Sequence, residues 1–175
     1  AAAIHYSHFS VTVADDRHRP DIETLCADLG IKYLARPTHE HRKAGNLNFA
    51  LSHTDKPFVL VLDADEQLRP EAREPLHQLM ARPELLLINL LRQELGALQS
   101  PYSNVSRLFR RHPAIHWSRA YHSLVDDSVA ELLQREPHWR IADCSTPALL
   151  HDGYRPELLA SGDKARRLRE AMENE

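Results

Sequence analysis

The chain has 175 residues, 42% of them hydrophobic, which is enough for one domain with a buried core. Its formal net charge of -3 argues against a general nucleic-acid binder, because no net positive field attracts the phosphate backbone. No apolar run approaches the roughly 20 residues that cross a bilayer, and no signal-peptide pattern opens the chain. We therefore expect a cytoplasmic domain without a membrane span, associated with a membrane only through a remainder outside this chain.

The first half of the chain alternates strand patterns with helix patterns. Residues 20–30 predict a helix, because Pro20 stands in the first turn and Gly30 follows the last periodic residue. The run FVLVL at 58–62 is apolar at every position, which is typical of a central strand covered on both faces. This alternation predicts an α/β sandwich with a largely parallel sheet. The other elements expected here are strands at 9–13, 31–35 and 84–91 and helices at 43–53 and 73–81.

The second half is less regular, and its patterns are shorter. Residues 156–175 form a charged segment with a thin apolar side, which predicts a helix. We therefore expect one domain over 1–155, followed by this C-terminal helix. The remaining expected elements are short strands at 106–111 and within 114–125, a helix at 128–136, and a strand running into a turn at 147–154.

Two of the predicted strands end in paired acids, Asp15-Asp16 and Asp63-x-Asp65. In open α/β sheets, ligands bind beyond the carboxyl ends of the strands. Carboxylates one residue apart in a turn can both reach Mg²⁺ or Mn²⁺, which completes its coordination with water and phosphate oxygens. The second pair therefore predicts a metal–diphosphate site. The alternative is a solvated turn in which an aspartate caps the next helix.

The helix before the D-x-D strand begins with a second polar group. The segment KAGNLN contains Lys43, Gly45, Asn46 and Asn48. Backbone amides beside a glycine at a helix N-terminus, next to a lysine, suit a phosphate group. This segment therefore predicts a phosphate cradle. The alternative is a capped helix with one exposed lysine.

Three motifs occur in order over residues 11–68: VADD, KAGNLN and DADE. In this order and spacing they resemble the inverting family-two glycosyltransferases of the GT-A fold, most closely the cellulose-synthase-like members. The second half resembles lipopolysaccharide-core and repeat-associated transferases through RLFRR, YHSLV and LLHDGY. The resemblance implies a GT-A-like (Rossmann-like) fold and a Mg²⁺ or Mn²⁺ cofactor. It also implies a nucleotide-sugar donor, expected to be a UDP-sugar, and a saccharide, lipid-linked or protein acceptor.

The resemblance also implies roles for single residues, position by position along the motifs. The D-x-D acids contact the donor and the metal, with Asp65 as the direct metal ligand. His151 matches a histidine that completes the metal or diphosphate site, and the alternative is a structural histidine in a turn. The other donor-site positions are Asp15 and Asp16 near the base and ribose, Lys43 and Asn46 near the diphosphate, and Asp63 as a contact to both donor and metal.

An inverting transferase needs a general base that removes the acceptor proton. The E-D and Q-x-x-R-W motifs of cellulose synthases are absent from this sequence, and the H-E of the other branch reads His122-Ser123. Because serine is a poor base, the candidates are His122 itself, Asp126 and Asp127.

The sequence also departs from the family at its start. Family members open with a strand of the VSVIIP kind, whereas this chain reads AAAIHYSHF, so we expect a truncated piece or a domain that lacks this strand. The second possibility keeps a degenerate, non-catalytic GT-A-like binding or assembly domain open. An aspartate-nucleophile phosphatase is a further alternative, disfavoured because Gln67 stands where that class has Thr or Val.

Overall fold

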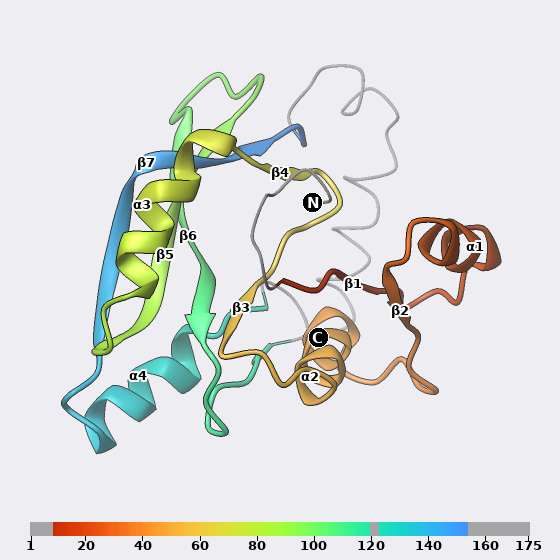
Figure 1. The fold of residues 1–175 in the computed structure, drawn as a ribbon, viewed down its shortest axis with the longest axis horizontal. Coiled ribbons are helices and arrows are strands. Elements are labelled where there is room, and N and C mark those ends of the chain that lie inside the picture. The colour runs from red at the N-terminus through yellow and green to blue at the C-terminus, as the bar shows by residue number, and fades with distance from the viewer. Residues whose placement is uncertain (1–8, 120–122, 154–175) are drawn as a thin grey trace.

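The computed structural model describes residues 9–119 and 123–153 and folds them into a mixed α/β arrangement (Figure 1). A five-stranded sheet forms the larger part. A two-stranded parallel sheet, β1 (Thr12–Ala14) with β2 (Lys32–Leu34), lies beside helices α1 (Pro20–Asp28) and α2 (Arg42–Ser52). The α/β class expected from the sequence is confirmed at the level of a domain that contains both helices and a sheet.

The large sheet has the strand order β3-β6-β5-β7-β4 and is mixed rather than largely parallel. Only β5 and β7 run parallel, and the other three pairings are antiparallel, so the predicted direction is wrong for this sheet. The cause is the short connection 95–101, which lets β5 and β6 pair only as an antiparallel hairpin. The strands are β3 (Phe58–Leu60), β4 (Glu66–Leu68), β5 (Leu85–Glu94), β6 (Tyr102–Arg110) and β7 (Arg140–His151).

The apolar run at 58–62 forms a shorter strand than predicted, at a different place. Within the described part of the chain, β3 pairs with β6 alone, so it is an edge strand and the predicted central position is wrong. Its apolar pattern still has a physical reason. Phe58 and Leu60 pack against one core and Val59 against the other, so both faces are covered.

The helices lie close to where the sequence predicts them. Besides α1 and α2, they are the 3₁₀ turn η1 (Pro70–Ala72), α3 (Arg73–Met80) and α4 (Asp126–Arg135). Helix α4 begins two residues earlier than expected, so Asp126 and Asp127 fall in its first turn, where the helix dipole favours carboxylates. No strand forms over 114–119, where the described structure has only a single bridge between Ser118 and Leu124.

Two hydrophobic cores cover opposite faces of the large sheet. On one face, α3 and η1 pack onto β5, β6 and β7 through residues such as Leu76, Ile88 and Leu149. On the other face, α4 and α2 pack around Phe109 and Trp117, whose rings meet edge to face at 5.3 Å between centroids. The sheet interior is thus filled with apolar side chains, and polar groups gather where the strands end.

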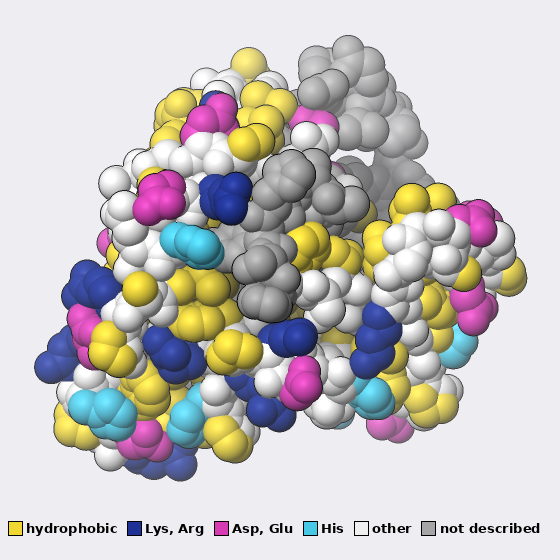
Figure 2. Space-filling model, viewed as in Figure 1, with side chains coloured by type: hydrophobic (Ala, Val, Ile, Leu, Met, Phe, Trp, Pro, Cys, Tyr) yellow, Lys and Arg dark blue, Asp and Glu magenta, His cyan; other side chains and the backbone are white. Residues whose placement is uncertain are grey.

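Two expectations fall outside the described residues: the missing first strand, which concerns residues 1–8, and the helix at 156–175. In the ranges 9–119 and 123–153, none of the helices has the length and apolar character that crossing a bilayer requires. Figure 2 shows Lys, Arg, Asp, Glu and His side chains interspersed on one face of the molecule rather than gathered by sign.

Candidate functional site

The D-x-D motif forms a tight turn between β3 and β4. The backbone N–H of Glu66 donates to the carbonyl oxygen of Asp63 at 3.0 Å. In return, the side chain of Glu66 accepts from the backbone N–H of Asp63 through Oε2 at 2.9 Å. This reciprocal pair fixes the backbone of the turn that carries Asp63 and Asp65.

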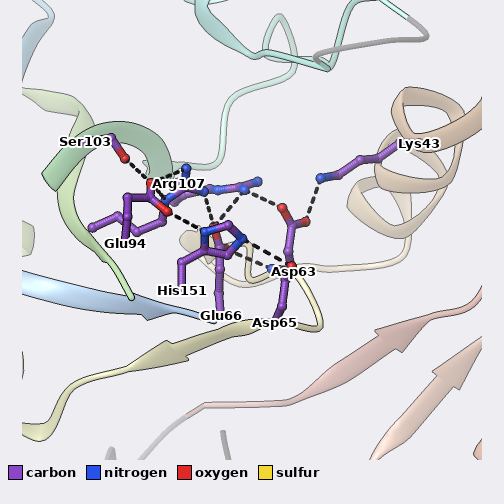
Figure 3. A network of polar contacts seen from close by, with 9 residues as sticks. Lys43, Asp63, Asp65, Glu66, Glu94, Ser103, Arg107 and His151 are labelled. Atoms are coloured by element: carbon purple, nitrogen blue, oxygen red, sulfur yellow. Dashed lines mark hydrogen bonds and ion pairs between the residues drawn. The ribbon is translucent and has the colours of Figure 1, made fainter. Parts of the chain in front are cut away.

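Asp63 lies between two cationic side chains (Figure 3). Lys43 Nζ, from the first turn of α2, is 2.6 Å from Oδ1, and Arg107 Nη2 is 2.6 Å from Oδ2. Burial alone would raise the pKa of Asp63, but the charges of Arg107 and Lys43 outweigh it and the pKa is lowered. The structure thus brings together Lys43 and Asp63, two residues that the sequence analysis assigned to the donor site.

Arg107 reaches this site because of an irregularity in the sheet. The pairing of β5 with β6 passes from Ile88↔Leu108 to Asn89↔Ser106, so Arg107 is an extra residue without a partner in the register. A bulge of this kind re-aims a side chain. Arg107 Nη2 thereby contacts both Asp63 and Glu66, the latter at 3.0 Å. The sequence analysis missed Arg107 as a site residue, and only its place in RLFRR could have drawn attention to it.

Glu66 is a buried acid whose carboxylate stabilises the D-x-D turn. Its Oε1 accepts from Arg107 and also from Arg92 Nη1 at 2.7 Å. A buried carboxylate needs such partners, because an unpaired charge away from water is strongly unfavourable. Glu66 therefore joins the D-x-D turn to β5 and β6.

His151 ends β7 and meets the second aspartate of the motif. Its Nε2 lies 3.2 Å from Asp65 Oδ2, and the backbone N–H of Asp152 donates to the carbonyl oxygen of Asp65 at 3.0 Å. The other ring nitrogen, Nδ1, lies 2.5 Å from Glu94 Oε2. The structure thus brings together Asp65 and His151, two residues that the sequence analysis assigned to one site.

Glu94 determines what the His151 ring can offer. Burial alone would raise the pKa of Glu94, but hydrogen bonds from Ser103, His151 and Arg92 outweigh it and the pKa is lowered. An ionised carboxylate only accepts, so Nδ1 carries a proton, and Nε2 is the ring nitrogen that faces Asp65. A proton on Nε2 or a cation bound between Nε2 and Asp65 satisfies this contact.

This donor set fits a hard divalent cation in part. Across 9–119 and 123–153, no three His, Cys, Asp or Glu side chains are grouped so as to hold a metal. Asp65 and His151 are the two side chains that could hold such an ion, and Mg²⁺ or Mn²⁺ bound by so few protein ligands takes the others from water and phosphate oxygens. Asp63 fits less well, because each of its oxygens already contacts a cationic side chain.

The predicted nucleotide-binding acids are engaged in internal contacts. Asp15 is 2% exposed and accepts from the backbone N–H groups of Arg17 and Arg19 and from the Tyr33 hydroxyl. Burial opposes ionisation, but the hydrogen bonds from Arg19, Arg17 and Tyr33 outweigh it and hold the pKa of Asp15 far below its usual range. Asp16, 31% exposed, is the acid of this pair that keeps surface for a ligand.

Arg36 ties Asp16 to the start of α2. Its Nε and Nη2 donate to the two oxygens of Asp16 at 2.6 and 3.1 Å, and its guanidinium also donates to the carbonyl oxygens of Glu40 and Arg42. The hydrogen bond from Arg36 lowers the pKa of Asp16 despite partial burial. Arg36 thus connects the predicted base-binding acid with the predicted phosphate cradle.

Asn46, expected near the diphosphate, contacts the small sheet through its side-chain amide. Its Nδ2 donates to the carbonyl oxygen of Ala14 at 3.0 Å, and it is buried. Its Oδ1 is a buried acceptor without a hydrogen-bond partner among the described residues. In this arrangement Asn46 fixes α2 against β1.

The candidate bases differ in their surroundings. Asp127 accepts from Ser118 Oγ at 2.6 Å and pairs with Arg119 at 2.9 Å, and these contacts lower its pKa. Asp126 accepts from Ser106 Oγ at 2.8 Å, while its Oδ2 is buried and unpartnered within the described ranges. His122 lies outside the described residues.

Comparison with known proteins adds the family. The family model described as "Glycosyl transferase family 2" matches residues 1–140, so the chain belongs to glycosyl transferase family 2, as its motifs indicated. A TPR repeat-containing protein of Synechococcus elongatus is 39% identical over 161 residues, covering 92% of this chain and 40% of that protein. Cellulose synthase 1 of Komagataeibacter xylinus is 49% identical over 55 residues, covering 31% of this chain and 4% of that enzyme. The cellulose synthase catalytic subunit of Pseudomonas fluorescens is 44% identical over 55 residues, covering 31% of this chain and 7% of that subunit.

Proposed function

We propose that this chain is a metal-dependent glycosyltransferase domain that takes a sugar from a nucleotide-sugar, specifically a UDP-sugar, and transfers it with inversion. The acceptor is a saccharide, a lipid-linked sugar or a protein. The observation that carries the proposal is the turn over 63–66, which combines an Asp65–His151 pair with an Asp63–Lys43 pair at the end of the strands. Membership of glycosyl transferase family 2 supports the same reaction class.

In this proposal, Asp65 and His151 hold Mg²⁺ or Mn²⁺. When bound, such an ion stabilises negative charge on a leaving diphosphate. Arg107 pairs with both Asp63 and Glu66, so its charge is balanced by acids within the protein. Lys43 pairs with Asp63 alone, and its side chain is 45% exposed, so in this proposal Lys43 is the cationic group that reaches a leaving anion.

The acceptor proton requires a base within hydrogen-bond reach. Asp127 is the weaker candidate, because Ser118 and Arg119 bind its carboxylate and lower its pKa. We therefore assign the base to Asp126 or His122. Loss of turnover in Asp126→Asn or His122→Ala, with normal UDP binding, supports this assignment, and full turnover in both variants contradicts it.

The first test is the melting temperature with UDP and Mn²⁺, with and without chelator. Ligand at about 100 times its dissociation constant adds roughly 2.7 kcal/mol, a shift of about 5–10 °C for a domain of this size. We expect this gain in wild type and in Glu71→Gln, a control at an exposed acid, and its loss in Asp65→Ala or with chelator. No gain in wild type contradicts the donor site, and a gain independent of metal and of Asp65 contradicts the metal.

Turnover separates the proposal from its alternatives. Release of UDP from a UDP-sugar in the presence of acceptors supports a transferase. Binding of UDP and Mn²⁺ without turnover favours the non-catalytic binding domain. The burial of Asp15 and its hydrogen bonds within the protein support that alternative. Hydrolysis of phosphate esters without any acceptor favours the phosphatase.

A further inference from the structure

We infer that Glu94 is a positioning residue of the metal site: it holds the His151 ring so that Nε2 faces Asp65. This inference rests on the proposed function, in which Asp65 and His151 hold the cation. It starts from the register of the sheet. His151 on β7 is paired with Glu94 on β5 on one side and with Glu66 on β4 on the other. The histidine is therefore flanked by two acids in a row across three strands.

The two flanking acids have different tasks. Glu66 turns its carboxylate toward the backbone N–H of Asp63 and toward two arginines, and so supports the first half of the D-x-D turn. Glu94 turns its carboxylate toward the His151 ring, at 2.5 Å from Nδ1. Figure 3 shows the ring between Glu94 and Asp65, with one nitrogen directed at each.

The carboxylate of Glu94 is itself held in place. Its Oε1 accepts from Ser103 Oγ at 2.6 Å and from Arg92 Nε at 2.8 Å, so Oε2 is left to face the ring. Glu94 is 7% exposed, and its side chain thus has little freedom to reach water instead. Ser103 on β6 and Arg92 on β5 fix Glu94 in the way that Glu94 fixes His151.

The consequence concerns the tautomer of His151. An acceptor at Nδ1 keeps the proton there and leaves the Nε2 lone pair for a cation shared with Asp65. Without that acceptor, the Nε2–H tautomer can donate to Asp65 and closes the same position to a metal. Loss of such an outer carboxylate typically lowers metal affinity about 10–100-fold.

The test uses full-chain Glu94→Ala, Glu94→Gln and Ser103→Ala, with Glu71→Gln as the matched surface control. Mn²⁺ binding, alone and with UDP, is followed by the electron paramagnetic resonance signal of free Mn²⁺. We expect about a 10–100-fold loss of affinity in Glu94→Ala, a smaller loss in Glu94→Gln, whose amide oxygen still accepts from Nδ1–H, and a smaller loss again in Ser103→Ala. Unchanged affinity in a folded Glu94→Ala overturns the inference.

A second readout does not need the metal. Nitrogen-15 NMR of histidine side chains at alkaline pH, with His151 assigned from His151→Gln, reports which ring nitrogen carries the proton. We expect Nδ1–H in wild type and in Glu71→Gln, and a shift toward Nε2–H in Glu94→Ala. If wild type binds no Mn²⁺ but Glu94→Ala still shifts the tautomer, the proposed function fails and the positioning by Glu94 stands. If wild type binds Mn²⁺ and the variants leave the tautomer unchanged, the positioning by Glu94 fails and the metal site stands. Should Glu94→Ala not fold, Glu94→Gln and Ser103→Ala give the same comparison.

Discussion

Asn48 of α2 binds both backbone polar groups of Trp117, which is 69 residues away in the chain. Its Oδ1 accepts from the Trp117 N–H at 2.7 Å, and its Nδ2 donates to the Trp117 carbonyl oxygen at 2.9 Å. These two hydrogen bonds join the helix that carries Lys43 to the segment before α4. Asp126 is the first residue of α4. An asparagine in KAGNLN that sequence analysis assigned to a phosphate cradle is therefore a clamp between two parts of the fold.

Replacement of Asn48 by leucine is expected to lower the free energy of unfolding by about 2–4 kcal/mol, because a buried N–H and a buried C=O lose their partner together. Asn48→Asp keeps an acceptor for the Trp117 N–H but places a carboxylate oxygen against the Trp117 carbonyl oxygen, so it should also be destabilised. Urea unfolding followed by tryptophan fluorescence measures both. Ser52→Ala, in the exposed last turn of the same helix, should stay within about 0.5 kcal/mol of wild type. Equal stability of Asn48→Leu and Ser52→Ala would show that the clamp is dispensable.

Gly45 should not tolerate alanine, although alanine usually stabilises a helix by about 0.5–1 kcal/mol. A Cβ at this position would lie well inside contact distance of Arg36 Nη1 and of the carbonyl oxygen of Glu40. The backbone atom cannot move aside cheaply, so we expect Gly45→Ala to lose about 1–3 kcal/mol. Ala50→Gly, further along α2, provides the comparison, with the ordinary cost of about 1 kcal/mol. A more stable Gly45→Ala protein in thermal unfolding would contradict the packing around Arg36.

Arg107 should be replaceable by lysine more easily than a buried arginine usually is. One nitrogen, Nη2, makes the contacts to both Asp63 and Glu66, and Nε is buried without a hydrogen-bond partner among the described residues. A single ammonium group can serve two acids, so Arg107→Lys should keep most of the stability, whereas Arg107→Met should lose about 3–5 kcal/mol. Chemical unfolding of the two variants decides this. Equal losses would mean that the planar guanidinium is required.

Asp15 should make the free energy of unfolding depend on pH in the acidic range. Its folded-state pKa is lowered, so its contribution is fully present above the unfolded pKa near 4 and is lost as the pH falls below it. As the pH falls, the free energy of unfolding of wild type should therefore decrease more steeply than that of Asp15→Asn. The difference in slope corresponds to the uptake of up to about one additional proton when wild type unfolds. The two curves, measured by urea unfolding between pH 6 and pH 2.5, should converge toward low pH. Parallel curves would contradict the role of Asp15.

Local patterns in the sequence predicted the local structure well. The helices over 20–30 and 73–81 and the buried strand at 84–91 follow from periodicity, proline and glycine, which act within a few residues. The direction of the sheet could not follow from such patterns. It depends on the hairpin connection 95–101 and on the return of β7 beside β5, both of which are non-local.

The sequence predicted the acids and the histidine of the candidate site, but not the charged residues that hold them in place. The D-x-D acids and His151 were assigned through motifs, and the structure places Asp65 and His151 in contact. The charged residues beneath them were missed. Arg92 and Glu94 end a run that reads as apolar, and a one-residue bulge such as that at Arg107 leaves no mark in the sequence.

The position of β7 has a consequence for the order of assembly. Among the described strands, β4 hydrogen-bonds only to β7, and β7 occupies the place between β5 and β4. The downstream anchor of the D-x-D turn therefore cannot form until the chain has been synthesised through His151, 86 residues beyond Asp65. Pairing at such sequence separation is slow compared with helix and hairpin formation. On the ribosome, Asp65 therefore has no partner from β7 until late in synthesis, and the contact with His151 forms only when one of the last strands described enters the middle of the sheet.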